Sequence, residues 1–586
     1  NKKRKIDLKY QLINLDLRPL LSIFKAEYKK FAENGSVYAP DSSFDINADI
    51  TAEKVILNSS DTGSLESVSF KGSWLNNTLS LDEFYAACPG NMVLSMSGSL
   101  VEENTSPQYF LKISLEGKDF QAFLNALGLN VKTYTQATYR NAAITFNLSG
   151  NNSAVSVNDL KFLLDKMNIA GVAGVTFNTE GNIYEIQLAA DSLNLDNYLP
   201  KAEFSTAMEN LREDIKSLSF LKWLNINAKF KSDKLTFRNV TMSNAVLNLD
   251  AANGKVHISE LSADNALNSQ FKISATADNL ASLDFKFDEI IFDLQSRNMA
   301  EIQDRLGLPW PKWNIFKANN FIASGSYSGN LHEGNLNAKV TADDVKLTYL
   351  GEVKQDNEFG FDGKLNLKTT NFSEFISNVG GSVKTNANTR GALNCNGIIK
   401  GSVSAWNFDD TTCILGISNY QGSGVFAKNK NNYRLNAKIK VDDFNIENVI
   451  NVQQNNNLST ISRLRDDNFI TRPDFSKETI VFDSYRNLLL NVDLATDKAV
   501  YKDKVFNNLS LQIINSENIL QLNNISAQIN EFNVAGNIQI NYIQSPSVKG
   551  NLTFRDIDLK GVGGNIYQFT NGRLNVVSDF EMPANS

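Results

Sequence analysis

The feature that most constrains this chain is a strand-like run followed by a short helical run, repeated six times. The clearest copy spans residues 184–200, where apolar residues from Leu195 onward are spaced i, i+3, i+4 and i+7 and so share one helix face. Similar helical runs begin at Leu17, Phe120, Met299, Phe372 and Ile446. Successive copies start 103, 75, 104, 73 and 74 residues apart, which predicts an array of related units.

A second, longer repeat supports the array. Residues 233–263 align without a gap on residues 497–527, at an offset of 264, and nearly every apolar position is apolar in both. A third copy begins near Ala48 and continues, with a small insertion, to Phe84. The copies recur at intervals longer than the roughly 20 to 50 residues of a solenoid coil, which argues against a solenoid of short coils.

The strand-like runs alternate between apolar and polar residues. In residues 433–441, the set Tyr433, Leu435, Ala437, Ile439 and Val441 separates from the set Arg434, Asn436, Lys438 and Lys440. Residues 335–340 and 532–540 show the same period. Successive side chains of a strand point to opposite faces, so one sheet face is apolar and the other meets water. The sequence predicts a mainly antiparallel β protein with short helices at the six repeats and one longer helix over residues 204–221.

Domain boundaries are expected to follow the repeats, because a repeat protein extends one core unit by unit. The expected segments are a first β-meander with helix units (1–130), a repeat with the long helix (131–224), a further repeat (225–311), further repeat units (312–452), a loop or linker (453–477) and a C-terminal repeat (478–586). The segment 453–477 is assigned as a loop because it is the most polar and least periodic.

Composition excludes several classes of protein. Charged residues make up 21% of the chain and hydrophobic ones 42%, which argues against wholesale disorder. The net charge is −7 and lysines are interspersed with acids, so no basic stripe suggests a nucleic-acid partner. No run of about 18 apolar residues predicts a transmembrane helix.

The sequence carries no recognisable catalytic constellation. Neither His257 nor His332 has a partner at metal-ligand or triad spacing, and both are expected on surface strands. Paired acids that could in principle serve a glycosidase or a calcium site are more simply solvated turns: Asp343–Asp344, Asp409–Asp410 and Asp442–Asp443. We therefore expect no enzyme, no cofactor and no metal.

Three cysteines are too few and too scattered for a disulfide framework. Cys395 and Cys413 could pair across neighbouring strands, and they could equally remain unpaired small apolar residues, as Cys88 could. Both readings stay open. This cysteine usage fits an oxidising compartment without requiring one.

The assembled units resemble the AsmA-like family of bacterial envelope proteins, which includes TamB-type relatives. The resemblance is carried by VSVNDLKFLLDKMNIAGVAGVTFNTEGNIYEIQLAADSLNLDNYLP at residues 155–200, similar to the family's succession of strands ending in a Leu-x-Leu-Asp-x-Tyr-Leu-like turn. The repeat at 233–263 and its copy at 497–527 look like the family's C-terminal repeat. The chain lacks the N-terminal membrane anchor typical of the family.

This resemblance implies a long, strongly curved β-sheet, a repeating β-groove with an apolar concave surface, lying in the periplasm. The full-length protein would be held at the inner membrane by an anchor missing from this chain. The implied function is to bind phospholipid and move it between the inner and outer membranes, supporting outer-membrane homeostasis. The implied partners are phospholipid acyl chains, the inner membrane and other envelope proteins.

The candidate lipid-lining residues are apolar strand positions: Leu224, Ile226, Phe230, Leu336, Val340, Leu435, Ile439, Val441, Val534, Ile538 and Ile540. An apolar sheet face with few helices to cover it must close, stack or hold something apolar. Acyl chains fit this need because burying each methylene is worth about 0.8 kcal/mol. The alternative is a structural envelope tether or β-solenoid adhesin whose apolar face is a sealed core.

Overall fold

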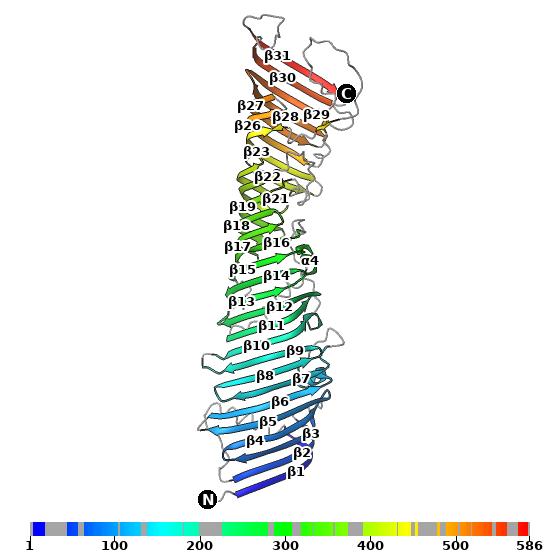
Figure 1. Cartoon of the computed structure of the whole chain (residues 1–586), viewed down its shortest axis with the longest axis vertical. Helices are drawn as coiled ribbons and strands as arrows, with labels where there is room; N and C mark the ends of the chain where they lie inside the picture. Colours follow the sequence, from blue (N-terminus) through cyan, green and yellow to red (C-terminus); the bar gives the residue numbers. More distant parts are fainter. Residues whose placement is uncertain are drawn as a thin grey trace. The chain divides into compact units, whose positions relative to one another are not determined.

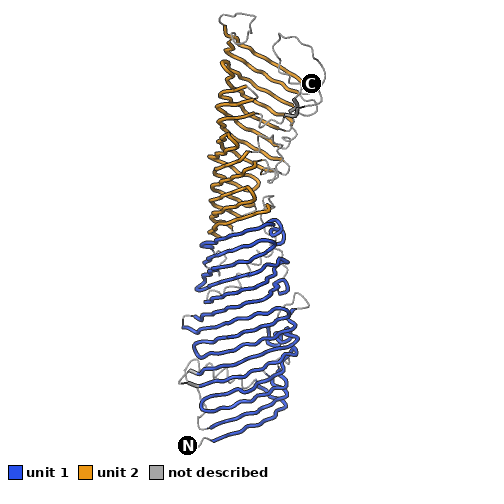
Figure 2. Tube along the Cα trace, in the orientation of Figure 1, with its two compact units in different colours: residues 1–310 blue, residues 311–586 orange. Residues whose placement is uncertain are grey.

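A computed structural model shows that the chain forms two compact units, residues 1–310 and 311–586 (Figure 2). The structure describes residues 4–17, 44–56, 64–103, 106–129, 138–179, 181–198, 225–278, 286–306, 318–330, 332–355, 358–372, 375, 391–429, 432–446, 452–454, 478–480, 488–501, 504–516, 518–541, 547–558 and 572–583.

The first unit is a sheet of strands that pair in chain order (Figure 1). Its strands are β1 (Arg4–Asp16), β2 (Phe44–Ile56), β3 (Ser64–Leu75), β4 (Thr78–Cys88), β5 (Met92–Glu103), β6 (Ser106–Gly117), β7 (Ala142–Gly150), β8 (Ala154–Leu164), β9 (Met167–Thr176), β10 (Ile183–Asn194), β11 (Asn225–Phe237), β12 (Val240–Ala252), β13 (Lys255–Asp264), β14 (Ser269–Asp278) and β15 (Lys286–Ser296). Helix α2 (Phe120–Ala126), the 3-10 helix η2 (Leu195–Asn197) and helix α4 (Met299–Leu306) follow β6, β10 and β15.

The second unit repeats this plan. Its main strands are β16 (Phe321–Gly329), β17 (Glu333–Ala342), β18 (Val345–Gln355), β19 (Phe359–Thr369), β20 (Leu393–Ser402), β21 (Ala405–Leu415), β22 (Ser418–Asn429), β23 (Asn432–Asn445), β26 (Leu488–Tyr501), β27 (Lys504–Ser516), β28 (Ile519–Ile529), β29 (Phe532–Asn541), β30 (Ser547–Asp558) and β31 (Arg573–Pro583). A separate two-stranded sheet joins β24 (Val452–Gln454) to β25 (Glu478–Ile480).

The predicted fold class is confirmed: each unit is mainly β, and its described strands form an elongated sheet that does not close into a barrel. The sheets are nevertheless mixed rather than wholly antiparallel. β1 pairs with β2, β10 with β11 and β23 with β26 in parallel. Parallel neighbours need a crossover connection, and the chain between each of these pairs contains one of the repeated helical runs. Strand periodicity alone does not reveal strand direction.

The predicted short helices are confirmed at two of the six repeats, where α2 begins at Phe120 and α4 at Met299. At Leu195 the structure has only the 3-10 turn η2, and at the fifth repeat Phe372 and Phe375 are helical. The run after Leu17, the long helix over 204–221 and residues 455–477 of the expected linker lie outside the described residues.

Strand directions place all the described helical segments of a unit at one edge of its sheet. In the first unit, β1 and β2 run parallel, as do β10 and β11, and the other neighbouring strands run antiparallel. As a result, β1, β6, β10 and β15 all end at the same edge. In the second unit, β19 and β23 end at a common edge in the same way. We call this the helix edge and the opposite one the hairpin edge.

The long sequence repeat corresponds to a structural module that begins in the second strand of a parallel pair. The three copies start in β2, β11 and β26. In β11 the Ser232 hydroxyl donates to the carbonyl of Lys234 at 3.0 Å, and in β26 the Thr496 hydroxyl donates to the carbonyl of Lys498 at 2.9 Å. Both hydroxyl residues are only 2% exposed. Equivalent positions, 264 residues apart, therefore make the same contact.

Each module also has a β-bulge at an equivalent place. Asn244 and Asn508 have φ angles of 51° and 49°, and each lies at a register shift between its strand and the next. Ser67, with φ 48°, lies at the corresponding shift between β3 and β4. Short polar residues tolerate this left-handed conformation, and a bulge increases local twist. The repeat thus encodes a bend as well as a strand pattern.

Clusters of buried apolar residues lie at the helix edge. In the first unit, a cluster that includes Met92, Phe120 and Leu164 lies where α2 meets the ends of β4 to β10. In the second unit, Ala499 and Leu509 form a similar cluster with partners at the ends of β23 and β28. These clusters seal one long edge of each apolar sheet face.

The paired acids cap backbone groups at the helix edge. Asp343 accepts from the backbone N–H of Asn320 at 3.0 Å, Asp344 from that of Asn371 at 3.2 Å, and Asp442 from that of Asn419 at 2.7 Å. Backbone N–H groups that lack a strand partner need such acceptors. Asp343 and Asp344 lie in a turn, as the sequence indicates. The other two pairs correct that expectation, because Asp442–Asp443 lies within β23 and Asp409–Asp410 lies within β21, where Asp410 has a φ of 45° at a bulge.

We expect Asp442→Ala to lower the free energy of unfolding at pH 7 by about 1 kcal/mol, because it removes the acceptor for two backbone N–H groups. Those N–H groups, of Asn419 and Asp443, hold the pKa of Asp442 below its ordinary value. A carboxylate with a lowered pKa stabilises the fold above its unfolded pKa of about 3.9, and this contribution disappears as pH falls through the folded pKa. Chemical denaturation from pH 3 to 7 should show the two proteins converging at low pH. A constant difference would contradict this assignment.

Candidate functional site

The two faces of each sheet differ in chemistry and in exposure. In β23, Arg434 and Lys438 are exposed on one face, whereas Leu435 and Ile439 are half-buried on the other. The predicted period-two separation is confirmed. We call these the polar face and the apolar face.

Strand register joins the apolar residues of the second unit into rows across the sheet. The central row runs through Leu336, Gly351, Gly363, Ile399, Phe408, Gly424, Ala437, Val492, Ile513, Leu522 and Ile538. It crosses eleven strands, from β17 to β29. Leu336 and Ile538, which are 202 positions apart in sequence, therefore belong to one continuous surface.

Two flanking rows connect other predicted residues. Nearer the helix edge, one row joins Val340, Leu347, Leu367, Cys395, Cys413, Tyr420 and Val441. Nearer the hairpin edge, another joins Val353, Phe361, Gly401, Trp406, Phe426, Leu435, Leu490, Asn515, Leu520 and Ile540. Ile439 lies between these rows, opposite Leu494, which in turn faces Leu511.

The first unit has an apolar face of the same kind. Ile226 lies between Tyr184 and Ala251, and Phe230 lies between Leu188 and Leu247. Both predicted residues are half-buried. Leu224 lies outside the described residues.

Among the described strands, each contacts its neighbours in the sheet, and no second sheet packs on the apolar face. Most of its side chains are accordingly half-buried rather than sealed. Some side chains are buried: Val441 at 0% and Val534 at 8% exposed towards the helix edge, Ala338 and Tyr349 in β17 and β18, and Ala437, Val492 and Leu494 in the middle of β23 and β26. Val441 and Val534 therefore belong to the sealed layer and are not accessible to a ligand.

Glycines bring strands close together on this face. A Cβ added at Gly363 would lie 2.6 Å from the Cα of Gly351 on the next strand, and one at Gly424 would lie 2.8 Å from the Cβ of Ala437. Real Cβ atoms do not approach so closely, so the neighbouring strands require glycine here.

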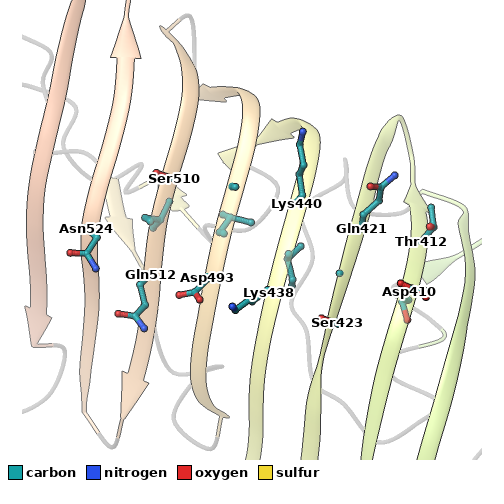
Figure 3. Close-up of a pocket in the computed structure, with 16 residues that line it drawn as sticks. Asp410, Thr412, Gln421, Ser423, Lys438, Lys440, Asp493, Ser510, Gln512 and Asn524 are labelled. Atoms are coloured by element: carbon teal, nitrogen blue, oxygen red, sulfur yellow. The ribbon is translucent and has the colours of Figure 1, made fainter.

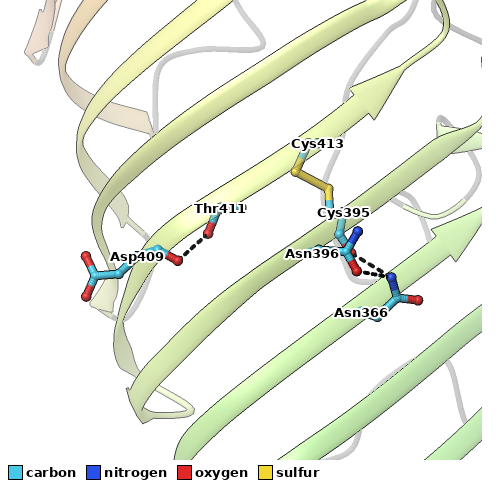
Figure 4. The surroundings of a disulfide bond; sticks show 6 residues. All are labelled: Asn366, Cys395, Asn396, Asp409, Thr411 and Cys413. Carbon is cyan, nitrogen blue, oxygen red and sulfur yellow. Dashed lines mark hydrogen bonds between the residues drawn. A yellow bond between two sulfur atoms is a disulfide. The ribbon is translucent and has the colours of Figure 1, made fainter.

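A disulfide joins Cys395 of β20 to Cys413 of β21 on the apolar face (Figure 4). It lies in the row between Leu367 and Tyr420. This settles the open alternative for these cysteines. Cys88 is free and buried in the cluster beneath α2, and its burial raises the pKa of the thiol.

A hollow on the polar face lies over β21 to β28 (Figure 3). Lys438 extends towards Asp493, whereas Lys440 forms an ion pair with Asp497 at 3.3 Å. Charges of both signs line the hollow, and it contains no histidine. No group of metal-ligating side chains occurs among the residues that the structure describes. The hollow therefore supports no particular reaction.

Sequence reasoning did not single out a run of aromatic side chains on the apolar face at the hairpin edge. The ring of Trp406 lies 6.0 Å from that of Phe408 and 5.4 Å from that of Phe426, whose ring lies 6.0 Å from that of Tyr433. The Lys428 ammonium lies 5.7 Å from the centre of the Tyr433 ring. Period-two spacing in the sequence places Trp406 and Phe408 on one face of a strand. Only the strand register shows that Phe426 of β22 and Tyr433 of β23 lie beside them.

The two histidines take no part in a site. His257 is exposed on β13, where its Nδ1 lies 2.9 Å from the Thr276 hydroxyl. His332 is exposed just before β17 rather than on a strand, because its N–H is used in the turn at Asn330.

Comparison with models of known protein families gives no match, and comparison with curated protein sequences gives none either. Within the described part of the chain, no helix has the length and apolar character needed to cross a membrane.

We expect the free thiol count of the denatured protein to be one without reductant and three after reduction, as alkylation and mass spectrometry would show. Replacing both Cys395 and Cys413 by serine should lower the free energy of unfolding by about 3 kcal/mol, because the bond closes a short loop of 18 residues. Cys88→Ser provides the comparison for loss of an unpaired cysteine. Three reactive thiols in the unreduced, denatured protein would contradict the disulfide.

Proposed function

We propose that the apolar face binds phospholipid acyl chains and conducts phospholipid along the sheet. The observation that supports this is the single layer: apolar rows in which most side chains stay half-buried rather than sealed, because no second sheet covers them among the described residues. An uncovered apolar surface of this extent is unfavourable in water unless something apolar occupies it.

The dimensions of the rows suit this ligand. Neighbouring strands lie about 4.8 Å apart, so the central row of eleven strands is about 50 Å long. The hydrocarbon core of a whole bilayer is about 30 Å thick, so the row exceeds the length of one acyl chain. Each buried methylene contributes about 0.8 kcal/mol, and successive strands offer equivalent apolar contacts. A lipid could therefore move from strand to strand without leaving an apolar surface.

Placement in the envelope is also part of the proposal. The resemblance to AsmA-like proteins suggests a periplasmic protein that is held at the inner membrane and supports outer-membrane homeostasis. The disulfide on the apolar face is consistent with an oxidising compartment. The inner membrane and other envelope proteins would then be the partners at which lipid is received and delivered, and no enzymatic step is required.

A second candidate is a structural tether with a sealed apolar core. The side chains of Ala338, Tyr349 and Val353 favour it, because they are buried. The apolar face is therefore covered in the middle of β17 and β18 as well as at the helix edge. Ile439 decides between the two functions, because its side chain is half-buried while its neighbours Ala437 and Leu494 are buried.

The decisive variant is Ile439→Asp, which places a charge on the half-buried part of the apolar face. If lipid occupies this face, the protein should unfold with a free energy within about 1 kcal/mol of the wild type and should lose its co-purified phospholipid. Val441→Asp, in the sealed layer of the same strand, should instead cost about 3 kcal/mol or more. Val425→Asp, on the exposed polar face of β22, is the matched control and should change neither property.

The measurements are chemical denaturation and mass spectrometry of extracted lipid on the same preparations. Wild-type protein without lipid would reject the proposal. An Ile439→Asp protein as unstable as Val441→Asp would instead favour the sealed tether.

A further inference from the structure

The aromatic run and Lys428 lie where the apolar face reaches the hairpin edge. β22 ends and β23 begins at this edge, and the register pairs Lys428 with Tyr433 and Phe426 with Leu435. Trp406 and Phe426 are half-buried, whereas Lys428 is exposed. The surface therefore changes from apolar to aromatic to cationic over a few side chains, as the interface of a membrane does.

Lys428 carries an ammonium group without an acidic partner among the described residues. Its backbone N–H donates to the carbonyl of Ser404 at 2.7 Å, which fixes the position of the residue. The nearby carboxylate of Glu358 accepts from the hydroxyls of Ser402 and Ser404 at 2.6 Å each. Within the described residues no ion pair neutralises Lys428, so its charge is available to an anion.

Charge complementarity identifies that anion. A ligand whose acyl chains lie along Phe408 and Ile439 would have its polar end at the hairpin edge, beside Lys428. In a phospholipid this end carries a phosphodiester. A zwitterionic lipid neutralises its phosphate with its own ammonium, whereas an acidic phospholipid has a negative charge left for Lys428.

We infer that Lys428, with the ring run from Trp406 to Tyr433, is a headgroup site that selects acidic phospholipids. This inference rests on the proposed lipid-binding function and adds the class of lipid. The aromatic rings hold the glycerol region at the edge, and the ammonium of Lys428 contacts the phosphate.

The test uses the full chain and vesicles of equal parts phosphatidylcholine and phosphatidylglycerol. After incubation and removal of vesicles, mass spectrometry gives the ratio of the two lipids on the protein. We expect the wild type to be enriched in phosphatidylglycerol, and Lys428→Gln to lower this enrichment by about threefold, the size expected of an exposed charge contact. Lys428→Arg should retain the enrichment. Lys438→Gln, an exposed lysine on the polar face of β23, is the matched control and should match the wild type.

A second arm separates a lipid headgroup from a free phosphate. Inorganic phosphate is titrated into the wild type and Lys428→Gln, with calorimetric detection. Phosphate binding that depends on Lys428, together with equal lipid ratios in all four proteins, would show a free-anion site and overturn the inference. Absence of phosphate binding with Lys428-dependent enrichment supports it.

The two proposals fail differently. Wild-type protein that takes up no lipid overturns lipid binding and the headgroup site together. Wild-type protein that takes up both lipids without preference, with Lys428→Gln unchanged, overturns the headgroup site alone. Thermal unfolding of each variant checks that the exposed substitutions leave the fold intact.

Discussion

The structure depends on the separation of apolar and polar side chains on the two faces of a single-layered sheet. A sheet that is apolar on one side normally packs against a second layer. Here the described strands contact mainly their neighbours in the sheet, apart from short helical segments at one edge. Stability must therefore come from cross-strand pairs and from the clusters at the helix edge, such as the one around Met92 and Phe120. Most other side chains of the apolar face stay half-buried.

This arrangement also explains why the repeat takes the form it has. In a chain whose strands contact mainly their neighbours, stability is approximately a sum of local terms, so each module must contain its own strand pattern, cap and bend. The buried hydroxyls of Ser232 and Thr496 and the left-handed residues Asn244 and Asn508 recur at the same offset for this reason. Glycines such as Gly363 then allow neighbouring strands to approach on the apolar side.

Variation in burial along the apolar face has a functional meaning within the proposal. Half-buried residues such as Ile439 can exchange a lipid for water or for the next lipid, whereas sealed residues such as Val441 hold the sheet together. The closed part at Ala338 and Tyr349 must open, or be passed at its edge, for lipid to move along β17 and β18. At Lys428 and its aromatic neighbours, in contrast, the apolar face reaches the exposed edge of the sheet, so the polar groups of a bound lipid could stay in water.

The sequence by itself determined the mainly β class, the face assigned to residues such as Leu435 and Lys438, the repeat positions and the start of α2 at Phe120, because these follow from local period and spacing. It left the pairing of Cys395 with Cys413 open, since nothing local says which strands are neighbours. Only the tertiary structure decided strand direction at the three parallel pairs, the rows that join Leu336 to Ile538, and the burial of Val441. The physical reason is that register and burial depend on hydrogen bonds and contacts between strands far apart in sequence, which a pattern within one strand does not contain.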